Sequence, residues 1–146
     1  MSYEVQFTSV EVTKALAARL ARLATPGTVI GLDGDLGAGK TSFVKGFATG
    51  LGIDEDNVYS PTFTLIHEYG PEGRVFHVDL YRIEELRDLA TLGLEDLFER
   101  EAVVLIEWGE RFPEILPADR TEIRIRVGDN DEREVSVTRV EALSGR

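Results

Sequence analysis

The chain has 146 residues, a length that suits one domain spanning 1–146 and is short for two. The 16 Lys and Arg residues against 27 Asp and Glu residues give a net charge of −11, which disfavours direct binding to DNA or RNA. The absence of cysteine excludes disulfides and thiolate chemistry, and two histidines are too few for most His-based metal sites. Met1–Val5 lacks the basic start of a signal peptide, and the apolar runs are only strand-length, so we expect a soluble, cytoplasmic protein without a membrane segment.

The N-terminal part predicts a helix followed by a buried strand. Thr8 and Glu11 have the spacing of a capping box, and Pro26-Gly27 ends the helical pattern. The apolar residues between these signals recur at helical spacing: Val12, Leu16, Leu20 and Leu23. Thr28–Leu32 is short and mostly apolar without alternation, which predicts a strand buried on both faces.

A phosphate-binding loop follows this strand. Residues Gly34 to Thr41 read Gly-Asp-Leu-Gly-Ala-Gly-Lys-Thr and match the pattern G-x-x-x-x-G-K-[ST] at every position. Its glycines let backbone N–H groups approach a phosphate, Lys40 supplies a charge for the β- and γ-phosphates, and the Thr41 hydroxyl can bind Mg²⁺. The predicted helix from Lys40 to Leu51 directs its N-terminus at the same anion. A glycine-rich turn that binds nothing is the alternative, but such a turn needs neither lysine nor threonine at the start of a helix.

The rest of the chain predicts a mixed α/β arrangement. Gly50 and Gly52 are expected to stop the second helix. Beyond them we expect a hairpin of Phe63–Tyr69 and Arg74–Leu80, helical turns over Ile83–Arg100 broken at Gly93, a buried strand Ala102–Glu107, and a last hairpin of Thr121–Val127 and Glu134–Val140. The predicted fold class is therefore a single α/β, P-loop NTPase-like domain with a mixed, mainly parallel sheet and antiparallel hairpins at its edges.

Two acidic residues stand where predicted strands end. Glu107 closes the apolar run Val103–Ile106, and Asp79 closes the second strand of the first hairpin. At the carboxyl edge of a parallel sheet, one of them would contact Mg²⁺ directly or through water, and the other would polarise the attacking water. Either can instead be a surface acid, since the chain contains 27 acidic residues.

Several further residues have two interpretations. Ser60-Pro61-Thr62 lies where many NTPases carry a switch that senses the γ-phosphate, and it can equally be a plain turn. Trp108, the only tryptophan, packs near the nucleotide or a partner, or else belongs to the core. His77 is expected to pack or hydrogen-bond within the hairpin rather than to act as a catalyst. Three arginines are candidate phosphate contacts, although isolated arginines are usually solvated: Arg82, Arg111 and Arg133.

The order and spacing of these motifs resemble one family. The motifs are Gly34–Thr41, Ser60-Pro-Thr-Phe-Thr64, His77-Val-Asp-Leu-Tyr-Arg82 and Glu107-Trp108. They are similar to those of the bacterial TsaE (formerly YjeE) ATPases, which assist biosynthesis of threonylcarbamoyladenosine on tRNA. The resemblance extends from Thr8 to Val140. It implies a compact P-loop domain whose weak ATP hydrolysis supports a partner complex, with subunits of the TsaB and TsaD types, that modifies an adenosine beside the anticodon.

The resemblance also implies roles for particular residues. Lys40, Asp79 and Glu107 would form the catalytic set, with Asp79 near the γ-phosphate of ATP. Thr41 and Glu107 would bind Mg²⁺. The phosphates of ATP or ADP would be held by Gly37, Ala38, Gly39, Lys40, Thr41 and Ser42, the last standing where many members have a second threonine. The switch would be Ser60, Pro61, Thr62, Phe63 and Thr64. The segment from Thr8 to Thr13 would approach the nucleotide base.

Three other functions stay open. A small-molecule kinase would need an acceptor pocket and a lid, for which the chain has little room. A GTPase would carry an Asn/Thr-Lys-x-Asp guanine motif, which this sequence lacks. A nucleotide-binding module without hydrolysis would act only through interactions. In the ATPase interpretation the chain contacts tRNA only indirectly, and its acidic surface meets basic patches on a partner.

Overall fold

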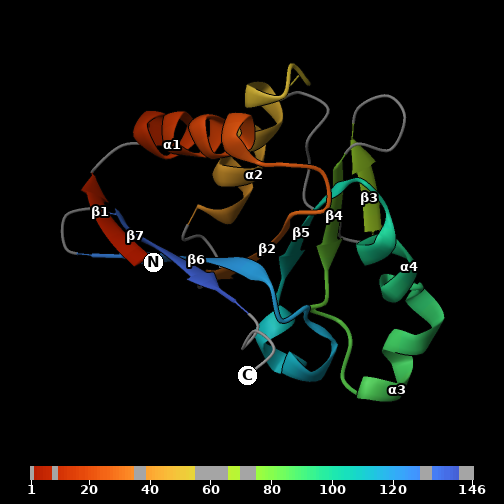
Figure 1. Cartoon of the computed structure of the whole chain (residues 1–146). Helices are drawn as coiled ribbons and strands as arrows, with labels where there is room; N and C mark the ends of the chain where they lie inside the picture. The colour runs from red at the N-terminus through yellow and green to blue at the C-terminus, as the bar shows by residue number, and fades with distance from the viewer. Residues whose placement is uncertain are drawn as a thin grey trace.

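A seven-stranded mixed sheet with helices on both faces makes up the described part of the chain, in the strand order β1-β7-β6-β2-β5-β4-β3 (Figure 1). The computed structural model describes residues 2–7, 10–34, 39–54, 66–69, 75–128 and 133–141. The strands are β1 (Ser2–Phe7), β2 (Val29–Gly34), β3 (Ile66–Tyr69), β4 (Val75–Asp79), β5 (Val103–Glu107), β6 (Arg120–Val127) and β7 (Arg133–Val140). The helices are α1 (Val10–Leu23), α2 (Lys40–Gly50), α3 (Leu86–Leu89) and α4 (Leu94–Glu99), with 3-10 turns η3 (Ala90–Leu92), η4 (Gly109–Arg111) and η5 (Pro113–Ile115).

The strand pairing confirms the predicted fold class. Strands β6, β2, β5 and β4 run parallel at the centre, and the pairs β1/β7, β7/β6 and β4/β3 are antiparallel. Strand β1 was not predicted, because Ser2–Phe7 carries no turn signal and its partner β7 lies at the other end of the chain. The four parallel strands therefore end at one edge of the sheet, where a P-loop-like fold places its site.

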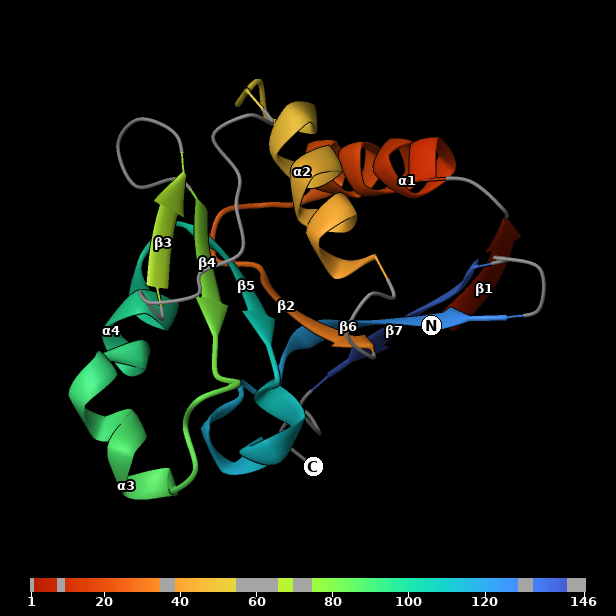
Figure 2. The same ribbon diagram turned by 180° about the vertical axis from the view of Figure 1, so that it is seen from behind.

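Two hydrophobic cores lie on the two faces of the sheet. Helices α1 and α2 cover one face, and α3 and α4 lie on the other, beside β4 and β5 (Figures 1 and 2). Strand β2 contributes to both cores, because Ile30 and Leu32 face α2 while Val29 faces the opposite side. This arrangement confirms the prediction of a strand buried on both faces.

The buried stripe of α1 differs from the one expected. Val12 is 44% exposed and Leu23 is 70% exposed, whereas Leu16 and Leu20 are partly buried. The residues that are fully buried on α1 are small: Thr13, Ala17 and Ala21. Small side chains let the backbones of α1 and α2 approach closely, and a pattern search for large apolar residues does not detect such a face.

Glycines of α2 explain this close approach. A Cβ atom on Gly46 would lie 2.4 Å from the carbonyl oxygen of Lys14, and one on Gly50 would lie 2.4 Å from that of Ala18. Helix α2 ends at Gly50, which confirms the predicted stop, and Gly50 is in addition a packing residue against α1. The predicted break at Gly93 is confirmed, since its φ of 69° separates η3 from α4, but the helical turns begin at Leu86 rather than at Ile83.

No helix in the described ranges has the length and apolar character that crossing a membrane requires.

Candidate functional site

The start of α2 faces the edge where the parallel strands end. Strand β2 ends at Gly34, and α2 begins at Lys40 after Gly39, whose φ of 111° is a left-handed conformation that favours glycine. No side chain caps α2, and its first turn contains no acidic residue. The first N–H groups of a helix have no acceptor within the helix itself, so this helix start can bind an anion.

Lys40 extends from this helix start into a buried contact with β5. Its Nζ lies 3.6 Å from Oε1 of Glu107 and 4.5 Å from the centroid of the Trp108 ring. Lys40 is 6% exposed and Glu107 is also 6% exposed, so solvent screens their attraction only weakly. The ammonium group that would face a phosphate is paired with the protein's own carboxylate in this structure.

Glu107 is held from its other side by His77. The Nε2 of His77 donates to Oε2 of Glu107 at 2.6 Å, and Nδ1 of the same ring lies 3.4 Å from the hydroxyl of Tyr69. Burial alone would raise the pKa of Glu107, but the hydrogen bond and charge of His77, together with Lys40, outweigh it and lower the pKa below its ordinary value. Glu107 is consequently an ionised carboxylate at neutral pH.

Asp79 lies beside Glu107 at the ends of two adjacent parallel strands. The two residues are register partners of β4 and β5, and the backbone N–H of Tyr81 donates to Oδ1 of Asp79 at 2.9 Å. Burial raises the pKa of Asp79, and the negative charge of Glu107 raises it further, against the opposing effect of the Tyr81 hydrogen bond. The prediction that both strand-end acids meet at one edge is confirmed by this register, and the two have opposite pKa shifts.

The donor set fits a magnesium ion that also binds phosphate. Thr41 is exposed in the first turn of α2, and Glu107 and Asp79 supply carboxylate oxygens at the facing strand ends. No group of three or more His, Asp or Glu side chains that could hold a metal lies within the described residues. Mg²⁺ usually takes one or two carboxylates plus phosphate oxygens and water, so a hydroxyl with one or two carboxylates is the set it needs beside a nucleotide.

Trp108 packs both at the site and against the core on the α3/α4 face of the sheet. Its φ of 67° is the one left-handed backbone among the described non-glycine residues. The ring has Lys40 at 4.5 Å and the guanidinium carbon of Arg111 at 4.8 Å, and it packs against Tyr81 with ring centroids 5.2 Å apart. Arg111 donates to the carbonyl oxygens of Tyr81 at 2.7 Å and Ile83 at 3.4 Å, so it ties the β4–α3 connection to η4.

The remaining predicted residues lie elsewhere or outside the description. Thr13 is 2% exposed on the buried stripe of α1. Arg133 begins β7 opposite Val127, two strands away from β2. Ser42 is half-buried in the first turn of α2, next to Thr41. The predicted residues outside the described ranges are Thr8, Gly37, Ala38, Ser60, Pro61, Thr62, Phe63 and Thr64.

His77 was expected to pack or form hydrogen bonds within its hairpin, but its shorter hydrogen bond is to Glu107 of β5. The 3.4 Å contact with Tyr69 is the hairpin part, and the 2.6 Å bond to Glu107 crosses to the neighbouring parallel strand. The alternation of β4 was the available signal, because it places His77 and Asp79 on the same face. The missing information was that β5 lies next to β4 in the sheet.

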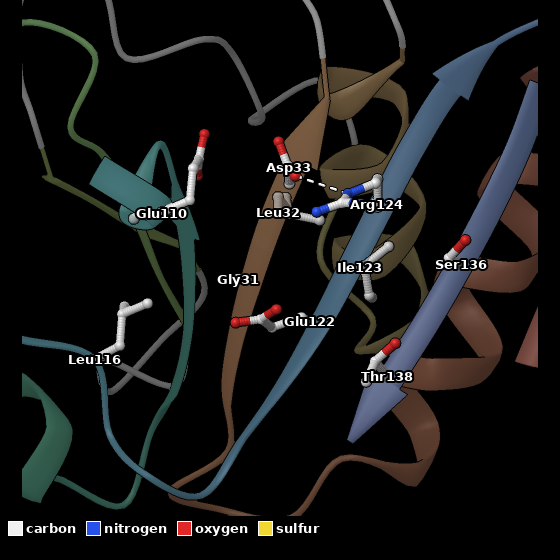
Figure 3. A pocket seen from close by; sticks show the side chains of 11 residues that line it. Gly31, Leu32, Asp33, Glu110, Leu116, Glu122, Ile123, Arg124, Ser136 and Thr138 are labelled. Carbon is white, nitrogen blue, oxygen red and sulfur yellow. Dashed lines mark hydrogen bonds and ion pairs between the residues drawn. The ribbon is translucent and has the colours of Figure 1, made fainter. Parts of the chain in front are cut away.

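A hollow lies on the sheet face opposite α2 (Figure 3). It has a volume of about 180 Å³ between η4 and strands β2 and β6, and Arg124 donates to Asp33 across it at 2.9 Å. Glu110 and Glu122 also line it, and Ser136 and Thr138 border it from β7. None of the predicted site residues is among the described residues that line this hollow.

The fold and the edge residues define a P-loop-like α/β protein. The family model described as "Threonylcarbamoyl adenosine biosynthesis protein TsaE" matches residues 7–135. The chain therefore belongs to the TsaE family.

Individual relatives agree with this assignment. The chain is similar to the tRNA threonylcarbamoyladenosine biosynthesis protein TsaE of Bacillus subtilis, with 48% identity over 132 residues that cover 89% of this chain and 81% of the relative. The protein of the same name from Treponema pallidum is 42% identical over 118 residues, covering 81% of this chain and 87% of the relative. The crystal structure of Bacillus subtilis YdiB superposes with a TM-score of 0.79 at 39% identity, covering 96% of this chain and 86% of that one. Family membership supports a role of the chain in tRNA threonylcarbamoyladenosine biosynthesis.

Proposed function

We propose that the chain is an Mg²⁺-dependent ATPase that binds ATP at the start of α2, hydrolyses it weakly, and drives a nucleotide-dependent cycle on a threonylcarbamoyl-transferase complex. One observation carries this proposal: Lys40, Glu107 and Asp79 converge from three elements on the uncapped N-terminus of α2. If Lys40 and Glu107 formed only a structural ion pair, the pair would not require a second carboxylate, Asp79, beside Glu107. It would also not require that the first turn of α2 lack an acidic residue.

Each residue has a defined part in this proposal. Lys40 leaves Glu107 and pairs with the β- and γ-phosphates, while the N–H groups of the loop and of the first turn of α2 hold the phosphate oxygens. Thr41 and Glu107 hold Mg²⁺, which when bound neutralises charge on the phosphate oxygens. Asp79 lies near the γ-phosphate and accepts the proton of the attacking water, because burial and the neighbouring Glu107 raise its pKa and make it the more basic of the two acids.

The proposed effect of ATP hydrolysis is a change in the affinity of this chain for its partners. The partners are transferase subunits of the TsaB and TsaD types, and this chain neither carries the threonylcarbamoyl group nor contacts tRNA directly. The Ser60–Thr64 segment, which lies outside the described residues, stays a prediction as the switch that senses the γ-phosphate. A net charge of −11 favours a basic partner surface over a phosphate backbone.

A phosphate-release assay tests the proposal directly. The purified chain is incubated with ATP or GTP, with and without the partner subunits, and with candidate acceptor molecules. We expect slow release of free phosphate from ATP that the partners accelerate, and a loss of about 100- to 1,000-fold in Lys40→Ala, the cost of removing one strong donor from a reacting phosphate. Lys45→Ala, a lysine on the same helix but away from Glu107, is the matched control and should retain activity.

The other functions give different results in the same assay. A phosphorylated acceptor would identify a kinase and overturn the proposal. A preference for GTP would indicate a GTPase. Tight binding of ATP without hydrolysis, even with the partners present, would indicate a nucleotide-binding module that acts only through interactions. Full turnover in Glu107→Ala would remove Glu107 from the catalytic set.

A further inference from the structure

Three buried side chains form a continuous hydrogen-bonded line across strands β3, β4 and β5. They are Tyr69, His77 and Glu107, and they are 4%, 2% and 6% exposed. The hydroxyl of Tyr69 lies 3.4 Å from Nδ1 of His77, and Nε2 of His77 donates to Oε2 of Glu107 at 2.6 Å. A fully buried imidazole that the proposed reaction does not use needs a reason to be there.

The strand register fixes the direction of this line. His77 is the register partner of Leu105, so its ring reaches the carboxylate two residues further along β5. Because a carboxylate only accepts hydrogen bonds, Nε2 of His77 carries a proton, and Nδ1 on the other side of the ring lies within hydrogen-bond distance of the Tyr69 hydroxyl. The ring is thereby held at both nitrogens, and its orientation determines where Oε2 of Glu107 lies.

The two oxygens of Glu107 have different partners. His77 binds Oε2, whereas Oε1 lies 3.6 Å from Lys40, which belongs to the phosphate loop. If Lys40 moves to a phosphate, as proposed above, His77 is the contact that still holds the carboxylate. Without it Glu107 is free to rotate, and its oxygen no longer lies at a fixed place relative to Thr41.

We propose that His77 is a positioning residue: it holds Oε2 of Glu107 so that Oε1 stays directed at the phosphate loop for Mg²⁺, and Tyr69 fixes the His77 ring. This inference rests on the proposed function, because it assigns a role at the same site. Hydrogen-bonding partners of metal-binding carboxylates change metal affinity by about 10- to 100-fold when they are removed. The effect is therefore expected on Mg²⁺-dependent binding and not on the nucleotide alone.

Substitutions at position 77 separate the hydrogen bond from packing. In His77→Gln the side-chain amide nitrogen stands near the place of Nε2 and can still donate to Glu107. In His77→Asn the amide stands near the place of Nδ1 and is too short to reach Glu107, although the polarity is the same. His77→Leu removes both contacts at similar volume, and Tyr69→Phe removes only the hydroxyl behind the ring.

The readout is the Kd of ADP measured by titration calorimetry with excess Mg²⁺ and again with EDTA. We expect His77→Leu and His77→Asn to lose about 10- to 100-fold of the Mg²⁺-dependent gain in affinity, with the Kd in EDTA unchanged. His77→Gln should keep most of the gain, and Tyr69→Phe should lose a smaller part of it. Turnover of ATP should fall in the same order.

The outcomes distinguish this inference from the proposed function. If the unsubstituted chain shows no Mg²⁺-dependent gain in ADP affinity, the proposed function itself fails. If it shows the gain and His77→Leu shows it equally, the positioning role is overturned. If His77→Leu does not fold, the comparison of His77→Asn with His77→Gln decides, and equal gains in these two variants overturn the role in the same way.

Discussion

Replacement of Gly46 by alanine tests how closely α1 and α2 must approach. Gly46 lies inside α2 and is buried, and a Cβ atom at this position would lie 2.4, 2.5 and 2.8 Å from three backbone atoms of Lys14. Ordinary van der Waals contact begins at 3.4 Å, so the two helices would have to separate by about 1 Å. Backbone atoms cannot rotate away as the end of a flexible side chain can.

The expected cost follows from two opposing effects. Overfilling a packed interior costs about 1–3 kcal/mol, whereas alanine in place of glycine inside a helix returns at most about 1 kcal/mol. Because the clash involves three backbone atoms and would disturb the packing of Phe43 and Phe47, we expect a cost at the upper end, about 3 kcal/mol, and hence a net loss of about 2 kcal/mol in the free energy of unfolding. For a chain of this size the melting temperature falls by roughly 2–4 °C for each kcal/mol lost.

Urea unfolding monitored by circular dichroism measures this loss. Gly31→Ala in β2 is the matched control, since the nearest atom to its new Cβ would be Cγ of Glu122 at 3.9 Å, an ordinary contact. We expect the control to differ little from the unsubstituted chain. A Gly46→Ala variant within about 0.5 kcal/mol of the unsubstituted chain would refute the reasoning, because that is the range of substitutions without a packing effect.

Three other predictions concern the site and the surface. Binding of ATP should change the emission of Trp108, because Lys40 leaves its ring, and Lys40→Ala should show a smaller change in a fluorescence titration. Asp79→Asn should raise the melting temperature at pH 7 while abolishing turnover. Burial and Glu107 raise the pKa of Asp79, so its charged form destabilises the folded state. The gain in melting temperature should shrink as the pH falls towards 3.8, the pKa of Asp79 in the unfolded chain. A constant gain from pH 7 to about 4 would contradict this cause. Affinity for the partner subunits should fall as salt rises, and a salt-independent Kd would leave the net charge of −11 without a role in binding.

The central part of the site was predictable because strand ends and helix starts have local signals. The phosphate-loop pattern locates the start of α2, and acids that close apolar runs mark the ends of β4 and β5. Parallel strands bring such ends to one edge, so the meeting of Asp79 and Glu107 follows from local patterns plus a general rule of α/β sheets.

The features that escaped prediction depend on which elements become neighbours. The bond between His77 and Glu107 requires knowing that β4 and β5 pair in parallel with Asp79 opposite Glu107. The buried stripe of α1 consists of small residues whose burial is determined by the glycines of α2. The alternation of β4 and the helical spacing of Thr13, Ala17 and Ala21 are present in the sequence, but neither pattern shows which element will pack against that face.

The pairing of β1 with β7 has a consequence for how the protein is made. Ser2 pairs with Thr138, so β1 leaves the ribosome long before the strand with which it pairs. At about 5–20 residues per second, synthesis of the residues between β1 and β7 leaves β1 unpaired for roughly 6 to 25 seconds. The candidate site residues lie on α2, β4 and β5, which all precede β7 in the chain. Pairing of β1 with β7 closes a loop that contains most of the chain, and such a closure is slow. During that interval the nascent chain can already contain the edge that carries the candidate site, while both β1 and the outer side of β6 are open to pairing with other chains.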